Sequence, residues 1–242
     1  MKDKIYTIPV VDAFKEDCEC PFCLMKKSLE DASIEFVLGP SYMEVDVREQ
    51  TNKLGFCKEH VNKLYSNKNR LGLALMLHSH LNEVKSQVEN IISTDEIKSK
   101  KKLFSNKQAD DKKIYTYITE KKSSCYICDK INMTFERYID TFFYLIKKDK
   151  SFVDLVQSCS GFCLEHFALI YNEAPKKLNG SSLESFYNMI TPIQINNINR
   201  ILEELDWFIK KSDYRFANEP WNNSKDALQR TIQKVNGIII NN

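Results

Sequence analysis

The sequence predicts an all-α protein that contains two pseudo-repeats. Apolar residues recur at steps of three and four along several long segments, which is the spacing of one face of a helix. The 242 residues include only six glycines and six prolines, so long helices fit better than many short strands. The hexapeptide GFCKEH at residues 55–60 returns as GFCLEH at residues 161–166, which indicates an internal duplication.

The composition is that of a globular chain with a sizeable core and little net charge. Hydrophobic residues make up 43% of the chain, and 35 basic residues face 33 acidic ones, so no overall attraction to nucleic acid or acidic membrane is implied. The N-terminal MKDKIYTIPVVDAF lacks the apolar core of a signal peptide, and no stretch approaches the ~20 apolar residues of a membrane span. We therefore expect a cytoplasmic protein without a membrane partner, whose eight cysteines are metal ligands or reactive thiols rather than disulfides.

We expect the first repeat to occupy residues 1–97. After Cys23 the apolar residues predict an amphipathic helix, which Gly39-Pro40 ends. The segment GFCKEH then opens a short helix that turns Val61, Leu64 and Tyr65 inward. A longer helix follows, with an apolar stripe at Ala74, Leu77, Leu81, Val84, Val88 and Ile91.

Residues 98–122 separate the two repeats. They contain nine lysines and three acidic residues, which is typical of a solvated linker or an exposed helix. A basic patch for nucleic acid is the alternative, although arginine and interleaved aromatic residues are scarce there.

The second repeat is predicted over residues 123–212, with a tail helix within 213–242. An amphipathic helix follows Cys128, and GFCLEH opens a second helix that turns Phe167, Ile170 and Tyr171 inward. In the long helix that comes next, Ser181 and Glu184 fit a capping box and Pro192 predicts a kink or a break. In the tail, Ser224 is the expected cap of a last helix that ends near Gly237.

Each repeat carries the same four metal-ligand residues, as C-x2-C followed by G-F-C-x2-H, with 33 or 34 residues between the second and the third cysteine of the pattern. Three thiolates and one imidazole suit a tetrahedral Zn²⁺. C-x2-C brings two sulfurs together across a tight turn, and C-x2-H at a helix start puts a sulfur and a ring nitrogen on one face. We predict two zinc ions per chain, so that each repeat is clamped by its own Cys3His site. The ligands are Cys20, Cys23, Cys57 and His60 in the first repeat and Cys125, Cys128, Cys163 and His166 in the second.

Three other interpretations of these residues stay open. The cysteines and histidines are core residues without metal, or the C-x2-C pairs are redox-active, which leaves the histidines unexplained. Cys18 and Cys159 raise the cysteine count to four in each half, so an iron–sulfur cluster is the second choice of cofactor. Their positions differ between the halves, which favours two ordinary thiols. His78 and His80 flank the stripe of the long first-repeat helix, and we interpret them as edge histidines.

Catalytic motifs are missing from the sequence. There is no G-x-S-x-G, H-E-x-x-H or phosphate-binding glycine loop, and no E-x-x-H of a carboxylate-bridged di-iron bundle. A metal site with four protein ligands has no open position for a substrate. We therefore expect no enzymatic activity and predict no catalytic residue.

Four segments together carry a resemblance that spans nearly the whole chain: CECPFC (18–23), GFCKEH followed by NRLGLALMLHSHL (69–81), the pair CYIC and GFCLEH, and SDYRFANEPWNNSKDALQR. With them the chain resembles an uncharacterised family of Firmicutes proteins, a domain of unknown function whose members sometimes carry the label of an ABC-transporter substrate-binding protein. The resemblance implies no activity. The transporter label also fits poorly, because such a protein needs an export signal.

The leading hypothesis is a zinc-stabilised helical scaffold that binds an unknown protein partner. One alternative is a thiol or metal sensor, in which Cys18 or Cys159 reacts beside a zinc thiolate. The other is a nucleic-acid-binding protein that uses the lysines of residues 98–122, among them Lys100, Lys101 and Lys102.

Overall fold

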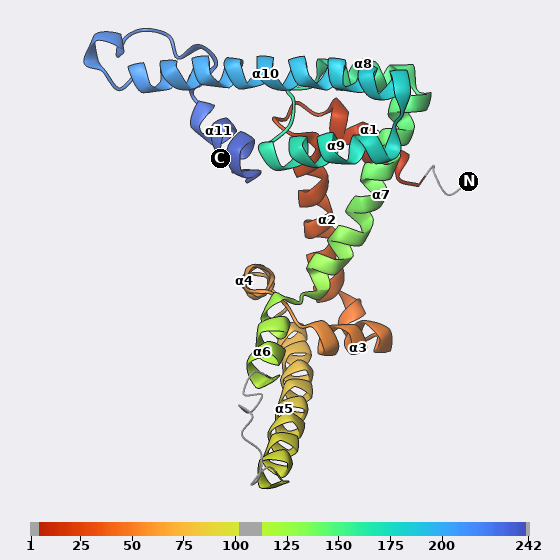
Figure 1. Ribbon diagram of the computed structural model, residues 1–242. Coiled ribbons are helices and arrows are strands. Elements are labelled where there is room, and N and C mark those ends of the chain that lie inside the picture. The colour runs from red at the N-terminus through yellow and green to blue at the C-terminus, as the bar shows by residue number, and fades with distance from the viewer. Residues whose placement is uncertain (1–4, 102–112, 241–242) are drawn as a thin grey trace. The chain divides into compact units, whose positions relative to one another are not determined.

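The computed structural model describes residues 5–101 and 113–240, with side chains described outside 95–101. Over these residues it contains eleven α-helices and no strand, which confirms the predicted all-α fold (Figure 1). The chain divides into two compact units. Unit 1 consists of Met1–Ser28 and Thr134–Asn242, and unit 2 consists of Leu29–Met133. The chain passes from unit 1 to unit 2 within α2 (Pro21–Leu38) and returns within α7 (Tyr126–Lys148).

Unit 1 contains both ends of the chain. Its further elements are α1 (Thr7–Lys15), α8 (Lys150–Ser158), α9 (Leu164–Lys177), α10 (Gly180–Lys210), η3 (Tyr214–Phe216), η4 (Asn222–Ser224) and α11 (Ala227–Asn236). The long helix α10 contacts α8, α9 and α11, and α1 contacts α8. Figure 1 shows α9 and α11 on the same side of α10.

The core of unit 1 is built from phenylalanines that come from six separate elements or loops. Phe14 of α1 stacks on Phe142 of α7 with ring centroids 5.6 Å apart, and it meets Phe152 of α8 edge-on at 5.1 Å. Phe22 of α2 contacts Phe142 at 5.2 Å. Phe162, in the loop before α9, and Phe186 of α10 are also buried. Such offset and edge-on aromatic pairs add specific attraction to the burial of large apolar surfaces.

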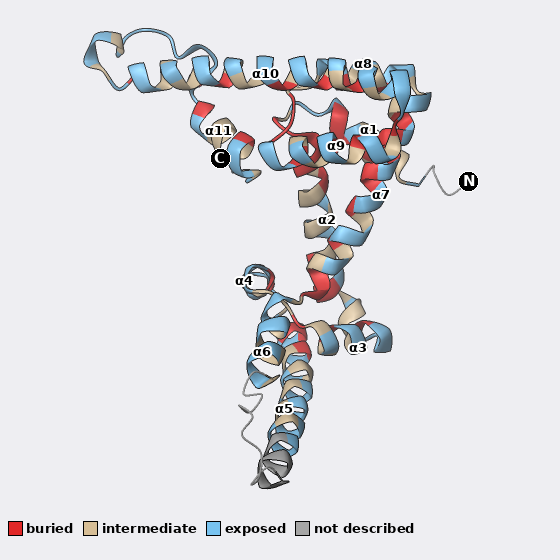
Figure 2. Cartoon of the chain, viewed as in Figure 1, coloured by how far each residue is buried: buried red, intermediate tan, exposed pale blue. Residues whose placement is uncertain are grey.

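Unit 2 is assembled around the start of its longest helix. Its further elements are η2 (Pro40–Met43), α3 (Val45–Leu54), α4 (Lys58–Ser66), α5 (Arg70–Lys101) and α6 (Lys113–Ser123). Helix α5 contacts α3, α4 and α6. Its buried residues lie in its first turns, and residues 77–94 are exposed or half-buried (Figure 2). The core of this unit includes Ile34, Val37, Leu64, Leu73, Met76 and Ile127.

Several local expectations are wrong in an instructive way. Helix α10 runs through Pro192 without a break, and it begins at Gly180 after Asn179, so Ser181 and Glu184 do not form its cap. Helix α11 begins after Asp226, although it does end at Gly237, which adopts the left-handed conformation with φ of 70°. The errors at the starts of α10 and α11 concern helix ends, where tertiary contacts decide between neighbouring residues.

The buried face of α5 is also shifted from the prediction. Leu73 and Met76 are buried, whereas Ala74 and Leu81 of the predicted stripe are exposed. Tyr65 and Tyr171, expected to turn inward, are likewise exposed. In a helix with apolar residues on several faces, hydrophobic spacing alone does not select the face that packs. No helix in the described ranges has the length and apolar character of a membrane span.

Candidate metal centres

The eight predicted ligands come together in two groups of four, and each group draws on both repeats. Site 1 consists of Cys20, Cys23, Cys163 and His166, and site 2 consists of Cys57, His60, Cys125 and Cys128. The expectation that each repeat supplies all four ligands of its own site is therefore wrong. The C-x2-C of one repeat meets the C-x2-H of the other. Each site lies wholly within one compact unit, site 1 in unit 1 and site 2 in unit 2.

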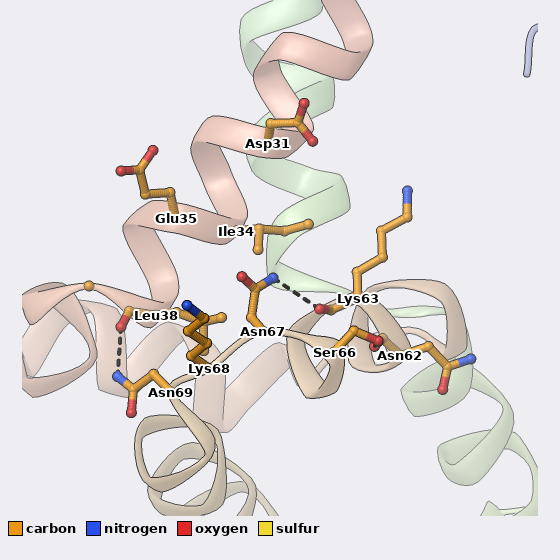
Figure 3. A pocket seen from close by; sticks show the side chains of 11 residues that line it. Asp31, Ile34, Glu35, Leu38, Asn62, Lys63, Ser66, Asn67, Lys68 and Asn69 are labelled. Carbon is orange, nitrogen blue, oxygen red and sulfur yellow. Dashed lines mark hydrogen bonds between the residues drawn. The ribbon is translucent and has the colours of Figure 1, made fainter. Parts of the chain in front are cut away.

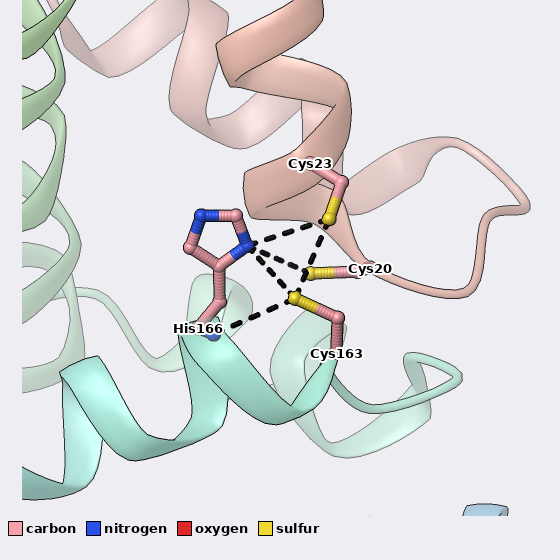
Figure 4. A group of neighbouring side chains, drawn as sticks. All are labelled: Cys20, Cys23, Cys163 and His166. Carbon is pink, nitrogen blue, oxygen red and sulfur yellow. Dashed lines mark hydrogen bonds between the residues drawn. The ribbon is translucent and has the colours of Figure 1, made fainter. Parts of the chain in front are cut away.

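Two helix N-termini converge on site 1. Cys20 directly precedes α2 and Cys23 lies in its first turn, while Cys163 is the N-cap of α9 and His166 lies in its first turn. Figure 4 shows the ring of His166 turned so that Nδ1 faces the three sulfurs. The backbone N–H of His166 points to Cys163 Sγ at 3.5 Å. Helix N-termini favour the thiolate form of cysteine, so the backbone prepares this group to hold a cation.

The spacing of the ligand atoms in site 1 fits a tetrahedral ion. Nδ1 of His166 lies 3.1 Å from Cys163 Sγ, 3.4 Å from Cys23 Sγ and 3.5 Å from Cys20 Sγ. The sulfurs of Cys23 and Cys163 are 3.5 Å apart. Zinc bonds of about 2.3 Å to sulfur and about 2.0–2.1 Å to nitrogen place tetrahedral ligands about 3.6 Å (S to N) and about 3.8 Å (S to S) apart. A disulfide is excluded at this distance, since its sulfurs lie about 2.05 Å apart.

Site 1 is enclosed by protein. Its four ligands are at most 4% exposed, and the rings of Phe22 and Phe135 lie 5.7 Å and 5.4 Å from the ring of His166. The Nε2 atom of His166 is buried and has no hydrogen-bond partner in the described part of the chain. A binding role for Nδ1 explains why a buried imidazole occupies this apolar pocket.

The thiols of site 1 differ in acidity because of their positions. Burial raises the pKa of Cys20 to about 12, and the hydrogen bond to Cys163 raises the pKa of Cys23. Hydrogen bonds from Cys20 and Cys23 lower the pKa of Cys163, which agrees with its place at the N-terminus of α9. Metal binding at this site therefore requires that protons leave the sulfurs.

Site 2 has the same construction. Cys57 is the N-cap of α4 with His60 in the first turn, and Cys125 precedes α7 with Cys128 in the first turn. Nδ1 of His60 lies 3.2 Å from Cys57 Sγ and 3.3 Å from each of Cys125 Sγ and Cys128 Sγ. The two loops are also joined directly, because the backbone N–H of Tyr126 donates to the carbonyl of Gly55 at 3.0 Å.

The surroundings of site 2 are more polar and more open. Cys57 and Cys128 are half-buried, whereas Cys125 and His60 are buried. Nε2 of His60 lies 3.0 Å from Glu30 Oε1, and Lys63 Nζ lies 2.5 Å from the other oxygen of Glu30. Burial lowers the pKa of His60, and the adjacent Glu30 opposes this shift. A carboxylate on the outer nitrogen fixes the tautomer that leaves Nδ1 free for a metal.

Each G-F-C loop is contacted by a side chain from a long helix, and this side chain is not part of the ligand motif. His80 of α5 bonds through Nδ1 to the carbonyl of Asn52, at the end of α3, at 2.7 Å. The ring of His80 packs against Gly55, so closely that a Cβ added to Gly55 would lie 2.6 Å from Nε2 of His80. Gln194 of α10 bonds to both the N–H and the carbonyl of Phe162, at 3.0 Å and 2.9 Å. Neither role was predicted. In the sequence, Gln194 is a polar residue among the isoleucines of a helical stripe, and this is the signal that would have pointed to it.

Cys18 and Cys159 belong to neither group of ligand atoms. Burial raises the pKa of Cys18 to about 11 and also raises the pKa of Cys159. Both thiols are therefore protonated near neutral pH, which makes them weak nucleophiles. Most of the predicted basic segment, including Lys100, Lys101 and Lys102, lies outside the residues whose side chains are described.

A broad cavity of about 940 Å³ lies beside α2 and α4 in unit 2 (Figure 3). Asn69 and Asn67 close parts of its wall by bonding to the carbonyls of Leu38 and Lys63. Its lining mixes Asp31 and Glu35 with lysines and amides, and contains no cysteine or histidine. The cavity therefore combines charged and amide groups with the apolar side chains of Ile34 and Leu38, and its lining offers no thiol or imidazole.

The chain was compared with known proteins by family, by sequence and by structure. No curated protein and no solved structure matches it. The profile of one family covers the chain from residue 1 to residue 242. The paired C-x2-C and G-F-C-x2-H motifs are thus part of a full-length match, and the chain belongs to DUF6062, a family of unknown function.

Proposed function

We propose that the protein binds two zinc ions, one in each compact unit, and that these ions are structural. The observation that carries the proposal is the donor set, three sulfurs and one imidazole Nδ1 at tetrahedral spacing, which occurs twice. Cys3His is typical of closed zinc sites, in which four protein ligands leave no position for substrate.

The expected contribution of the ions to folding is large. Apparent binding free energies of structural zinc are about 10–16 kcal/mol, comparable with the whole stability of a typical domain. Site 1 joins residues more than 130 positions apart, since Cys23 and Cys163 are separated by 140 residues in sequence. The ion of site 1 would thus hold together the two chain segments of unit 1, and the ion of site 2 would join two distant parts of the continuous segment that forms unit 2, near Cys57 and near Cys125.

Zinc stoichiometry of paired cysteine variants tests both the metal and the pairing. The wild type should contain two zinc ions and show no visible absorption. C20S/C163S removes two ligands of site 1 and should retain one zinc. C20S/C57S removes one ligand from each site and should retain none.

The opposite result, one zinc in C20S/C57S and none in C20S/C163S, would show that each repeat binds its own ion. Iron with visible absorption would overturn the assignment of zinc and favour a cluster. Single variants C20S and C125S, each expected to retain one zinc, control for loss of the whole fold.

We further propose that the metal-stabilised helices serve as a scaffold for a protein partner. Large apolar side chains are exposed along α10, among them Ile195, Leu202 and Ile209, at intervals of seven residues. Heptad spacing is typical of a helix that packs against another helix. If this surface binds, L202E should abolish capture of the partner while zinc content stays at two, and S185E, an exposed site on the same helix, should change neither.

A further inference from the structure

The C-terminal helix α11 ends against the sulfurs of site 1. A Cβ placed on Gly237, which ends α11, would lie 3.6 Å from Cys163 Sγ and 3.6 Å from Cys23 Sγ. This is ordinary van der Waals contact. The backbone at the end of α11 therefore covers part of the ligand group. The four-ligand motif by itself gives no indication that a segment so distant in sequence covers site 1.

One turn earlier, Lys234 fastens α11 to both loops that carry the ligands. Its side chain is buried, and Nζ donates to the carbonyl of Glu19 at 2.8 Å and to the carbonyl of Ser160 at 2.6 Å. Glu19 directly precedes Cys20, and Ser160 lies three residues before Cys163. Nζ also lies 3.0 Å from the carboxylate of Glu19. The ammonium group of Lys234 can thus donate all three of its protons to the two chain segments that must separate for the metal to leave.

A partly buried network of ion pairs supports this lysine. Arg200 of α10 binds both oxygens of Glu19, at 2.8 Å and 2.7 Å. Arg230 of α11 bonds to Glu204 of α10 and to Asp226 at the start of its own helix. Partly buried ion pairs are screened less by salt than fully exposed pairs. Glu19 is therefore contacted by Arg200 from α10 and by Lys234 from α11, and these charged contacts determine the position of α11.

We propose that α11 is a latch on site 1 and that Lys234 controls how fast the metal leaves that site. The inference rests on the proposed metal binding and adds the element that regulates it. When α11 is docked, its end covers the sulfurs and its lysine holds the two ligand loops together. When α11 is displaced, the sulfurs of Cys23 and Cys163 lose this cover and become open to a competing thiol or chelator.

The experiment compares metal release from full-length wild type, Lys234→Met and Lys225→Met. Methionine keeps the length of the side chain but cannot donate, and Lys225 is an exposed lysine just before α11, so it is the matched control. Zinc transfer to a chromogenic chelator is followed over time. The phase of each site is identified with C20S and C125S, which each lack one site.

We expect Lys234→Met to release zinc from site 1 about tenfold faster or more, the effect of losing a charged hydrogen bond, while release from site 2 is unchanged. Lys225→Met should match the wild type at both sites. An unchanged rate at site 1 would overturn the latch, and so would an equal acceleration at both sites, which indicates general destabilisation. Wild type without bound metal would instead refute the proposed function.

Reciprocity gives a second readout that does not depend on release rates. If docking of α11 strengthens metal binding at equilibrium, the metal must also stabilise docking by the same free energy. Amide hydrogen exchange in Ala227–Asn236 should therefore rise in C20S, together with the rest of unit 1, and remain at the wild-type level in C125S. In metal-loaded Lys234→Met it should rise while α9 (Leu164–Lys177) stays protected. Equal exchange in C20S and wild type would contradict the coupling even if Lys234→Met failed to fold.

Discussion

Site 1 and site 2 use the same four residue types, the same helix starts and the same histidine atom, yet their surroundings differ. Around site 1, the ligands are buried among aromatic rings, Nε2 of His166 has no polar partner in the described residues, and α11 covers two sulfurs. Around site 2, two sulfurs are half-buried and Nε2 of His60 meets Glu30. The repeated motif fixes the donor set, whereas residues outside the motif determine how each site is enclosed and tuned.

The largest expected effect separates the two units. C125S should abolish zinc binding at site 2 and remove hydrogen-exchange protection from Leu29–Met133, because about 10 kcal/mol of metal binding free energy supports that fold. C20S should do the same to the helices of unit 1. Loss of protection across the whole chain in both variants would show that the units do not fold independently, and the comparison would then fail.

A smaller effect tests the polar surroundings of site 2. Glu30→Gln removes the carboxylate behind His60 and should weaken zinc binding at site 2 by about 10- to 100-fold, with site 1 unchanged. Competition with a chelator of known affinity measures this. Glu59→Gln alters an exposed carboxylate beside the same histidine in sequence and should leave both affinities unchanged. Equal affinities in Glu30→Gln and wild type would remove the assigned role of Glu30.

The smallest effect concerns the two loop glycines, both with positive φ, 65° at Gly55 and 79° at Gly161. Alanine at either position should lower the free energy of unfolding by about 1–3 kcal/mol through backbone strain. Gly55→Ala should cost more, because its Cβ would lie 2.6 Å from His80, whereas Gly161→Ala brings a Cβ to 3.2 Å from Gln194. Unfolding by denaturant, monitored in each unit by amide hydrogen exchange, measures the two losses of stability. A larger loss in Gly161→Ala than in Gly55→Ala would refute the steric argument.

Sequence spacing was sufficient to identify the helical fold, the eight cysteines and histidines that gather in two groups, and the helix starts that carry them. It could not identify which C-x2-C meets which C-x2-H, because both repeats present identical half-sets and nothing local distinguishes the partners. The tertiary fold decides, since α2 and α9 begin side by side in unit 1, where Cys20 and Cys163 meet. Glu30, Gln194 and Lys234 were missed for a related reason. Their roles depend on contacts with residues far away in sequence.

The exchange of half-sites between repeats has a consequence for synthesis on the ribosome, which proceeds from the N-terminus. Cys20 and Cys23 emerge first, and the next complementary pair to emerge is Cys57 and His60, not their final partners. The native partners of site 1 follow only after the last ligand of site 2 has been made. A metal ion captured early by the nascent chain would therefore hold the wrong four ligands. The finished protein then requires that ion to change partners when Cys125 and Cys128 arrive.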